Sequence, residues 1–492
     1  MRAAGVLLHL SSLPSPYGMG TMGQSARSFV DFLVQSGMKY WQLLPICPTS
    51  YGDSPYQSFS TFAGNPYFID LDLLEEDGLL QKSEYQNLPW GDDPARVDYG
   101  LLYQNRFRVL VLACRRLLAR SPNQYESFCN ENRFWLEDYA LFMALKNKNG
   151  GGPWTQWPQP LKNREPQALA QAREELREEV DFWKAVQYLF FTQWRSLKEY
   201  ANSRGIQIIG DLPIYVAADS VDVWSDPSAF QLDENLLPTQ VAGCPPDGFS
   251  ATGQLWGNPL YDWEAMARDG FTWWIRRIQV LCSTYDILRI DHFRGFAGYY
   301  SIPYGSTDAC NGQWRTGPGI ALFRAVEKAL GKLPIIAEDL GFLTPDVRQL
   351  LADSGFPGMK VLEFGFDSRD GGDYLPHTYP RNCVVYTGTH DNEPILGWFD
   401  TAPAPDTALA VEYLRLTREE GYHWGMMAAA WASVGDLAIV QAQDLLGLGH
   451  SSRMNTPSTL GGNWCWRALP GAFDDTLAAK IHRQLELYGR LA

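Results

Sequence analysis

The chain has 492 residues, of which 45% are hydrophobic and 20% are charged, and this composition excludes an intrinsically disordered protein. Its formal net charge of -15 argues against nucleic acid and anionic membrane surfaces as partners, because an acidic surface repels phosphate groups. A neutral substrate is compatible with that charge. The 18 Trp and 24 Tyr side chains suit the flat apolar faces of sugar rings, although most aromatic residues simply belong to a core.

The apolar run near the N-terminus, residues 3–10, predicts a strand and not a signal peptide. It is short, contains His9 and lacks a small-x-small cleavage site. No stretch of the sequence approaches the roughly 18 apolar residues of a membrane span. The eight cysteines are scattered without the CxxC spacing of zinc or redox sites, which favours reduced thiols and a cytoplasmic protein.

Eight short apolar or β-branched runs end in a polar residue or a glycine, and each predicts a β-strand. Segments with helical periodicity, such as 26–36 and 182–203, lie between several of them, and Gly205 follows the second as a helix stop. This alternation predicts an α/β fold with a parallel sheet, and eight strands are the number that a closed (β/α)8 TIM barrel needs. The predicted strands are 5–10, 40–44, 206–210, 286–290, 333–337, 359–364, 383–386 and 437–440.

Two connections in this barrel are much too long for ordinary loops. About 160 residues separate the second and third predicted strands, and about 75 separate the third and fourth. Most connections in compact domains are far shorter. We therefore expect a single catalytic domain, residues 1–492, with one insertion at about 46–200 and another at about 212–284. The first insertion includes an amphipathic segment, 134–145, and the second includes the stretch 245–261.

Carboxylates follow four of the predicted strands, at the ends where a TIM barrel places its active site. Asp211 follows the third strand, Asp291 the fourth, Glu338 the fifth and Asp391 the seventh. Any one of them could be the N-cap of the next helix. Four that converge on one mouth, together with an arginine and two histidines, indicate a catalytic site.

Two of these carboxylates have the surroundings that glycosidic bond cleavage requires. Arg289 and Asp291 are two residues apart and share one face of a strand, so the guanidinium should lower the pKa of Asp291, as suits a nucleophile. A purely structural ion pair would give the same pattern. Glu338 follows three apolar residues, which predicts a raised pKa and a general acid. A retaining enzyme places two such carboxyl groups about 5 Å apart, and we predict that separation for Asp291 and Glu338.

Nine short motifs occur in order along the chain, and the full set is far more specific than any one of them. With these motifs the sequence resembles the amylomaltase (4-α-glucanotransferase) family, a relative of the α-amylases, from the first strand to the end of the chain. The motifs are 8–18 (LHLSSLPSPYG), 54–58 (SPYQS), 210–216 (GDLPIYV), 246–250 (PDGFS), 253–259 (GQLWGNP), 289–295 (RIDHFRG), 337–341 (AEDLG), 388–392 (GTHDN) and 463–467 (NWCWR).

The resemblance implies a (β/α)8 barrel with inserted subdomains and without the C-terminal β domain usual in α-amylases. It implies Asp291 as nucleophile, Glu338 as general acid/base and Asp391 as transition-state stabiliser. Tyr51 is either part of a remote glucan contact or a plain surface aromatic. The substrate-binding residues that the resemblance implies are Arg289, His292 and His390 at the cleavage point, Tyr56, Asp211 and Asn463 at the mouth, and Asp247, Phe249, Ser250, Gln254 and Trp256 in a flap over the acceptor side.

The function implied is a retaining transfer by double displacement. A segment of a malto-oligosaccharide or α-1,4-glucan donor moves to the 4-hydroxyl of glucose or another glucan, without a metal or cofactor. The same carboxylates would serve an α-glucan hydrolase, which differs only in passing the fragment to water. A catalytically silent glucan-binding protein is a further alternative, and the presence of all three carboxylates argues against it.

Overall fold

The chain folds into an eight-stranded parallel barrel, as predicted. The computed structural model describes residues 2–50, 52–246, 250–341, 343–368 and 374–491. The strand order is β10-β11-β12-β1-β2-β3-β6-β9, and the amide of Ala337, the last residue of β9, donates to the Pro357 carbonyl before β10 (2.9 Å), which joins the two sheet edges. The strands are β1 (Ala3–Leu7), β2 (Tyr40–Gln42), β3 (Gln207–Leu212), β6 (Ile287–Ile290), β9 (Ile335–Ala337), β10 (Gly358–Val361), β11 (Cys383–Tyr386) and β12 (Leu437–Gln441).

Each of the eight strands lies where the apolar runs predicted it, with ends that differ by a few residues. The clearest difference is at β1, which ends at Leu7 and not at residue 10. Beyond it the backbone turns into a short 3-10 helix, Leu10–Ser12, in which the Ser12 amide donates to the His9 carbonyl (3.0 Å). The apolar residues that follow Leu7 remain buried although they lie outside the strand, and the Leu8 amide still donates to the Gln42 carbonyl of β2 (3.1 Å).

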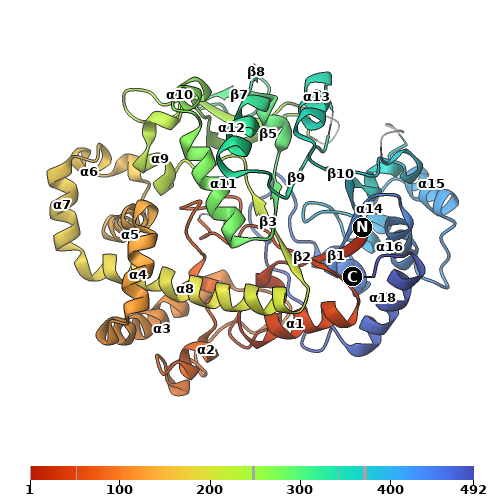
Figure 1. Cartoon of the computed structure of the whole chain (residues 1–492), viewed down its shortest axis with the longest axis horizontal. Coiled ribbons are helices and arrows are strands. Elements are labelled where there is room, and N and C mark those ends of the chain that lie inside the picture. Colours follow the sequence, from red (N-terminus) through yellow and green to blue (C-terminus); the bar gives the residue numbers. More distant parts are fainter. Residues whose placement is uncertain (1, 51, 247–249, 342, 369–373, 492) are drawn as a thin grey trace.

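Helices surround the barrel, but they are distributed unevenly (Figure 1). Seven of them, α2 to α8, lie between β2 and β3. Between β10 and β11 the described residues form only short 3-10 turns. The helices are α1 (Gln24–Gln35), α2 (Leu71–Glu76), α3 (Tyr99–Arg120), α4 (Asn123–Glu131), α5 (Arg133–Lys148), α6 (Gln159–Lys162), α7 (Pro166–Glu175), α8 (Arg177–Ser203), α9 (Val221–Ser225), α10 (Trp263–Arg268), α11 (Thr272–Thr284), α12 (Ile320–Leu330), α13 (Pro345–Ser354), α14 (Ile395–Thr401), α15 (Ala404–Leu414), α16 (Tyr422–Ala432), α17 (Ala442–Leu445) and α18 (Asp475–Leu487).

Helix α8 links the barrel to the helices between β2 and β3. Its apolar side chains recur at helical spacing, and Trp183, Leu189 and Phe190 are buried. The helix packs against α1 of the barrel as well as α3 and α5. It ends before Gly205, whose φ of +81° suits glycine and turns the chain into β3. This amphipathic helix therefore connects the helices between β2 and β3 to the barrel.

A second, antiparallel sheet in the order β5-β4-β7-β8 lies beside the barrel and was not predicted. Three of these strands contain glycine, β5 alternates exposed and half-buried residues over its first four positions, and every residue of β8 is exposed, so most of this sheet lacks the continuous buried apolar runs of the barrel strands. The strands are β4 (Gln240–Cys244), β5 (Gln254–Pro259), β7 (Gly298–Pro303) and β8 (Gln313–Thr316).

The two ends of the chain meet at the base of β1 (Figure 1). There the buried Arg490 guanidinium donates to the backbone carbonyls of Ala3 (2.9 Å), Trp431 (2.6 Å), Ser433 (3.0 Å) and Gly435 (2.9 Å). This one side chain joins the residues after α18 to the start of β1 and to the end of α16 and the residues between α16 and β12. In the described part of the chain, no helix is long and apolar enough to cross a bilayer.

Candidate active site

Parallel pairing of β3 with β6 places Asp211 beside Arg289 inside the barrel. The two residues are partners in the strand register. Gly210 precedes Asp211, and a Cβ there would collide with the Tyr285 ring, so the outer face of β3 is closely packed at this point. Alternation along the strand then turns Asp211 inward. Both of its carboxylate oxygens lie 2.7 Å from Nη1 of Arg289, and its side chain is fully buried.

Asp291 and Glu338 are the next residues along β6 and β9. The register of these strands ends with Ile290 opposite Ala337, and the Glu338 amide donates to the Ile290 carbonyl (3.0 Å). Because residues at the same step of neighbouring parallel strands face the same side, both carboxyl groups point into the mouth of the barrel. Asp291 Oδ1 lies 3.1 Å from Nη1 of Arg289, which confirms that these two residues share a face. Their mutual separation of about 5 Å stays a prediction.

The expectation that Arg289 gives Asp291 a low pKa is wrong. Although the Asp291 side chain keeps 28% of its surface exposed, burial in the barrel mouth raises its pKa well above that of an ordinary aspartate. Arg289 opposes this shift, but its guanidinium lies closer to Asp211, and the charges of Asp211, Glu338 and Asp391 push the pKa of Asp291 further up. One arginine cannot neutralise this many carboxylates, so the site favours holding a proton.

Glu338 has the raised pKa that its apolar approach predicted, and burial is the main cause. The positive charge of Arg289 limits this rise of the Glu338 pKa. Hydrogen bonds from the backbone amides of His292 (2.6 Å to Oε2) and Leu340 (2.9 Å to Oε1) limit it as well. These two hydrogen bonds also hold both oxygens of the carboxyl group in fixed positions. Burial therefore favours the protonated form of both carboxyl groups, Glu338 and Asp291.

Tyr56 and His390 form one wall of the site. Their rings stack with centroids 5.0 Å apart, and the Tyr56 hydroxyl donates to Asp211 Oδ2 (2.7 Å). Burial lowers the pKa of His390, so its imidazole is neutral at neutral pH and can share hydrogen bonds with sugar hydroxyls. Its Nε2 lies 3.4 Å from Asp391 Oδ1, so the residue also contacts a predicted catalytic carboxylate.

His292, the residue after Asp291, and Trp256 lie next to each other. His292 adopts a left-handed backbone conformation (φ +50°), and burial lowers the pKa of its imidazole to about 3. The Trp256 ring of β5 meets the His292 ring edge to face with centroids 4.9 Å apart, and its indole N–H donates to Gln254 (3.1 Å). Ser250 donates to the Gly253 carbonyl (2.7 Å) at the turn before β5. Tyr51, Asp247 and Phe249 lie outside the described residues.

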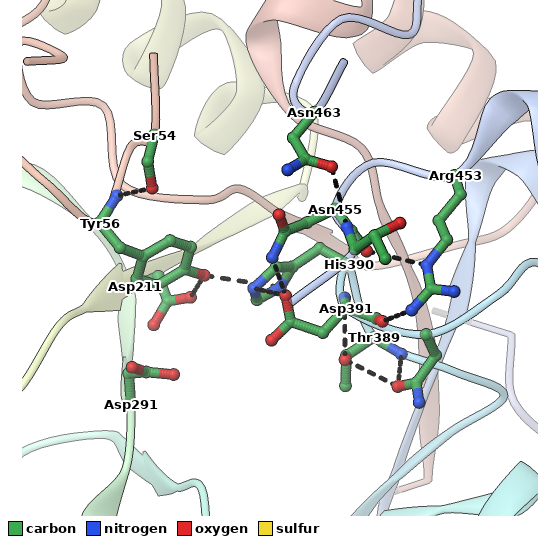
Figure 2. Close-up of polar contacts among 12 residues, drawn as sticks. Ser54, Tyr56, Asp211, Asp291, Thr389, His390, Asp391, Arg453, Asn455 and Asn463 are labelled. Atoms are coloured by element: carbon green, nitrogen blue, oxygen red, sulfur yellow. Dashed lines mark hydrogen bonds and ion pairs between the residues drawn. The ribbon is translucent and has the colours of Figure 1, made fainter. Parts of the chain in front are cut away.

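Asp391 is held by a group of residues that the motifs did not indicate. Asn455 Nδ2 donates to its Oδ1 (2.6 Å) and Arg453 Nη2 donates to its carbonyl (2.5 Å), as Figure 2 shows. Both come from the segment after β12, a strand for which the sequence predicted no terminal polar residue. Asn463, predicted at the mouth, is engaged by its own loop, since its Oδ1 accepts from the Thr456 amide (3.0 Å).

Asp211, Tyr56, Asp291, His390 and Asp391 thus converge from β2, β3, β6 and β11 on one mouth (Figure 2). Among the described residues, no group of three or more His, Cys, Asp or Glu side chains has the arrangement of a metal site. The chemistry available is that of carboxyl groups in different surroundings, with neutral imidazoles and one buried guanidinium beside them.

The family model for 4-alpha-glucanotransferase matches residues 8–471. A 4-alpha-glucanotransferase from Clostridium butyricum is 50% identical over 485 residues, which cover 98% of this chain and 100% of that protein. One from Thermus thermophilus is 48% identical over 501 residues, which cover 100% and 99% of the two chains.

Solved structures agree with these matches. The amylomaltase from Streptococcus agalactiae, in complex with acarbose, has a TM-score of 0.98 at 44% identity, with 100% of both chains covered. The amylomaltase from Corynebacterium glutamicum has a TM-score of 0.77 at 20% identity, with 100% of this chain and 74% of that chain covered, and supports the fold alone. The chain therefore belongs to the 4-alpha-glucanotransferase family.

Proposed function

We propose that this chain cleaves an α-1,4-glucan, holds the released segment as a glycosyl ester on Asp291, and transfers it to the 4-hydroxyl of glucose or another glucan. The observation that carries the proposal is the position of Asp291 and Glu338 one step beyond the last register pair of β6 and β9, with Arg289 against Asp291. Neighbouring strands lie about 4.8 Å apart, so this position supports the separation of about 5 Å that a retaining mechanism needs.

The first step forms the ester. Asp291 in its ionised form attacks the anomeric carbon, while protonated Glu338 donates its proton to the departing glycosidic oxygen. Both carboxyl groups have a raised pKa, and this step requires the proton on Glu338 and the negative charge on Asp291. The contact of Arg289 with Asp291 (3.1 Å) supports that distribution, since the guanidinium stabilises negative charge there.

The transition state carries positive charge on the sugar ring. Asp391 and Asp291 can stabilise that charge electrostatically from their positions at the mouth. Neutral His390 and His292 can share hydrogen bonds with sugar hydroxyls without adding a positive charge of their own. The second step reverses the first, because Glu338 now removes a proton from the incoming 4-hydroxyl, and two inversions leave the configuration retained.

Donor and acceptor are neutral α-glucans. The acidic surface of the chain does not repel such molecules, and the relative from Streptococcus agalactiae, solved in complex with acarbose, supports a site for compounds of this size. In this proposal the chain is one catalytic domain with insertions at about 46–200 and 212–284. A cytoplasmic location, where short glucans are metabolised, rests on the scattered cysteines.

Incubation with maltotriose tests the proposed function. Transfer yields glucose and longer chains while the number of reducing ends stays constant, whereas a hydrolase raises the number of reducing ends. We expect glucose and maltopentaose as the first products, with reducing ends unchanged. A steady rise in reducing ends without longer products would identify a hydrolase, and recovery of uncut maltotriose would identify a binding protein.

A further inference from the structure

We propose that Asn455 and Arg453 are positioning residues for catalysis: together they fix the direction of the Asp391 carboxylate toward the sugar. This inference rests on the proposed function, in which Asp391 stabilises the transition state. Both residues follow β12, whereas Asp391 follows β11, and Figure 2 shows Arg453 on the side of Asp391 away from Asp211 and Tyr56. They have no contact of their own with Asp291 or Glu338 among the hydrogen bonds of the described residues.

Asn455 binds the carboxylate directly. Its Nδ2 lies 2.6 Å from Asp391 Oδ1, and an ionised carboxylate only accepts hydrogen bonds, so the amide must present its N–H2 group. His390 Nε2 approaches the same oxygen at 3.4 Å. Within the described residues Oδ2 has no hydrogen-bond partner, and the Asp391 side chain is 45% exposed. One oxygen is therefore held by the protein while the other remains available to the substrate.

Arg453 holds the backbone on both sides of this contact. Its Nη2 donates to the Asp391 carbonyl (2.5 Å), its Nε to the Asn455 carbonyl (2.8 Å) and its Nη1 to Glu393 Oε1 (2.6 Å). The Asn455 amide donates to the His390 carbonyl (3.1 Å), so the two segments are joined in both directions. A single guanidinium uses all three of its nitrogens to fix the loop 389–393 against the residue that orients Asp391.

Glu393 gives this arrangement its rigidity. Its side chain is only 10% exposed, and it accepts from His450 Nδ1 (2.9 Å) as well as from Arg453. A charged pair with so little exposure has few alternative rotamers, because a displaced guanidinium would leave the Glu393 carboxylate buried without its main partner. Moving Arg453 away from the Asp391 carbonyl would therefore cost free energy, so the hydrogen bond to that carbonyl is kept.

Kinetics of Asn455→Leu test the proposal. The loss of one hydrogen bond to a charged group predicts a fall in kcat of roughly 10- to 100-fold, with KM changed by less than about threefold, because substrate still binds to the other residues of the mouth. Arg453→Met should lower kcat at least as much, and Arg453→Lys should be intermediate, since lysine keeps the charge opposite Glu393 but loses the forked donors.

A matched control removes the same type of hydrogen bond far from the mouth. Asn202 Nδ2 donates to Asp286 Oδ2 (2.8 Å) at the opposite ends of β3 and β6. Asn202→Leu should leave kcat and KM unchanged. Thermal melting of every variant shows whether a loss of activity comes from unfolding, and a KM-neutral loss of kcat in a fully folded variant excludes a merely structural role.

A double-mutant cycle separates this proposal from the proposed function. The donor is an activated glycosyl fluoride. In an enzyme that already carries Asp391→Ala, adding Asn455→Leu should change the rate by less than about threefold, because the carboxylate that Asn455 binds is absent. The same 10- to 100-fold fall in both backgrounds, or wild-type kcat for Asn455→Leu alone, would overturn the positioning role. Full activity of Asp391→Ala would overturn the role of Asp391 itself and, with it, the need to position that residue.

Discussion

Asp291 and Glu338 stand side by side at the ends of β6 and β9, one residue beyond the register pair Ile290–Ala337. This position decides their chemistry. Both carboxyl groups face the mouth, both are shielded enough to have a raised pKa, and only Asp291 contacts Arg289. The strands thus set two acids close together in unequal surroundings, which is the arrangement that a retaining mechanism needs.

Glu338→Gln tests the role of the general acid. The variant should lose about 10²- to 10⁴-fold of its rate on maltotriose, because the leaving sugar oxygen then departs without a proton. With α-maltotriosyl fluoride as donor, formation of the ester should be far less impaired, since fluoride leaves without protonation. Equal losses with both donors, measured by stopped-flow release of the leaving group, would show that Glu338 is not the acid.

The pH dependence of kcat/KM tests the charge balance around Asp291. Because the pKa of Asp291 is raised, the acid limb should lie well above pH 4, the ordinary range of an aspartate. Asp211 adds to this shift and draws Arg289 toward itself. Asp211→Asn removes that negative charge, so Arg289 stabilises the ionised form of Asp291 more strongly. The pKa of Asp291 should fall, and the acid limb should move to lower pH. An acid limb that stays in place or moves upward would contradict the assignment.

Trp256→Ala tests what keeps water from the ester. The indole ring lies against His292, the residue after Asp291, where it can cover an acceptor sugar. Its removal should lower the ratio of transfer to hydrolysis about tenfold, which corresponds to about 1.4 kcal/mol. Reducing-end assays beside product chromatography measure the ratio. Tyr304→Ala, an exposed aromatic after β7, is the control and should leave it unchanged.

Arg490→Met tests what holds the residues after α18 against the base of the barrel. The guanidinium is completely buried and donates to the carbonyls of Ala3, Trp431, Ser433 and Gly435. Loss of these charge-assisted bonds leaves buried carbonyls unpaired and should cost about 3 kcal/mol of stability.

In a thermal melt that loss appears as a fall in the apparent Tm, with kcat/KM of the folded enzyme unaltered. Arg483→Met, an exposed position on α18, should change stability by less than about 0.5 kcal/mol and serves as the control. Equal melting temperatures for the two variants would show that Arg490 does not fasten the barrel base.

Much of this architecture was predictable because barrel strands are buried on both faces and appear as short apolar runs. Asp211, Asp291, Glu338 and Asp391 were found because each is a polar residue close behind one of these runs. The antiparallel sheet was missed because a strand such as β8, with every residue exposed, has no hydrophobic pattern.

Two features of the site depend on the folded structure. Asn455 was missed because it reaches Asp391 across 64 residues of sequence and belongs to no catalytic residue type. The pKa of Asp291 was predicted with the wrong sign, since the neighbouring arginine is visible in the sequence whereas burial and the carboxylates of other strands are not.

Trapping of the intermediate tests the central claim most directly. An activated fluoro-sugar that forms the ester quickly and releases it slowly should label one side chain, and peptide mass spectrometry should place the label on Asp291. Asp291→Ala should then take up no label and lose at least about 10⁴-fold of its maltotriose disproportionation while melting normally, whereas exposed Asp353→Asn should behave as wild type. A label on another side chain, or near-normal disproportionation by Asp291→Ala, would contradict the mechanism.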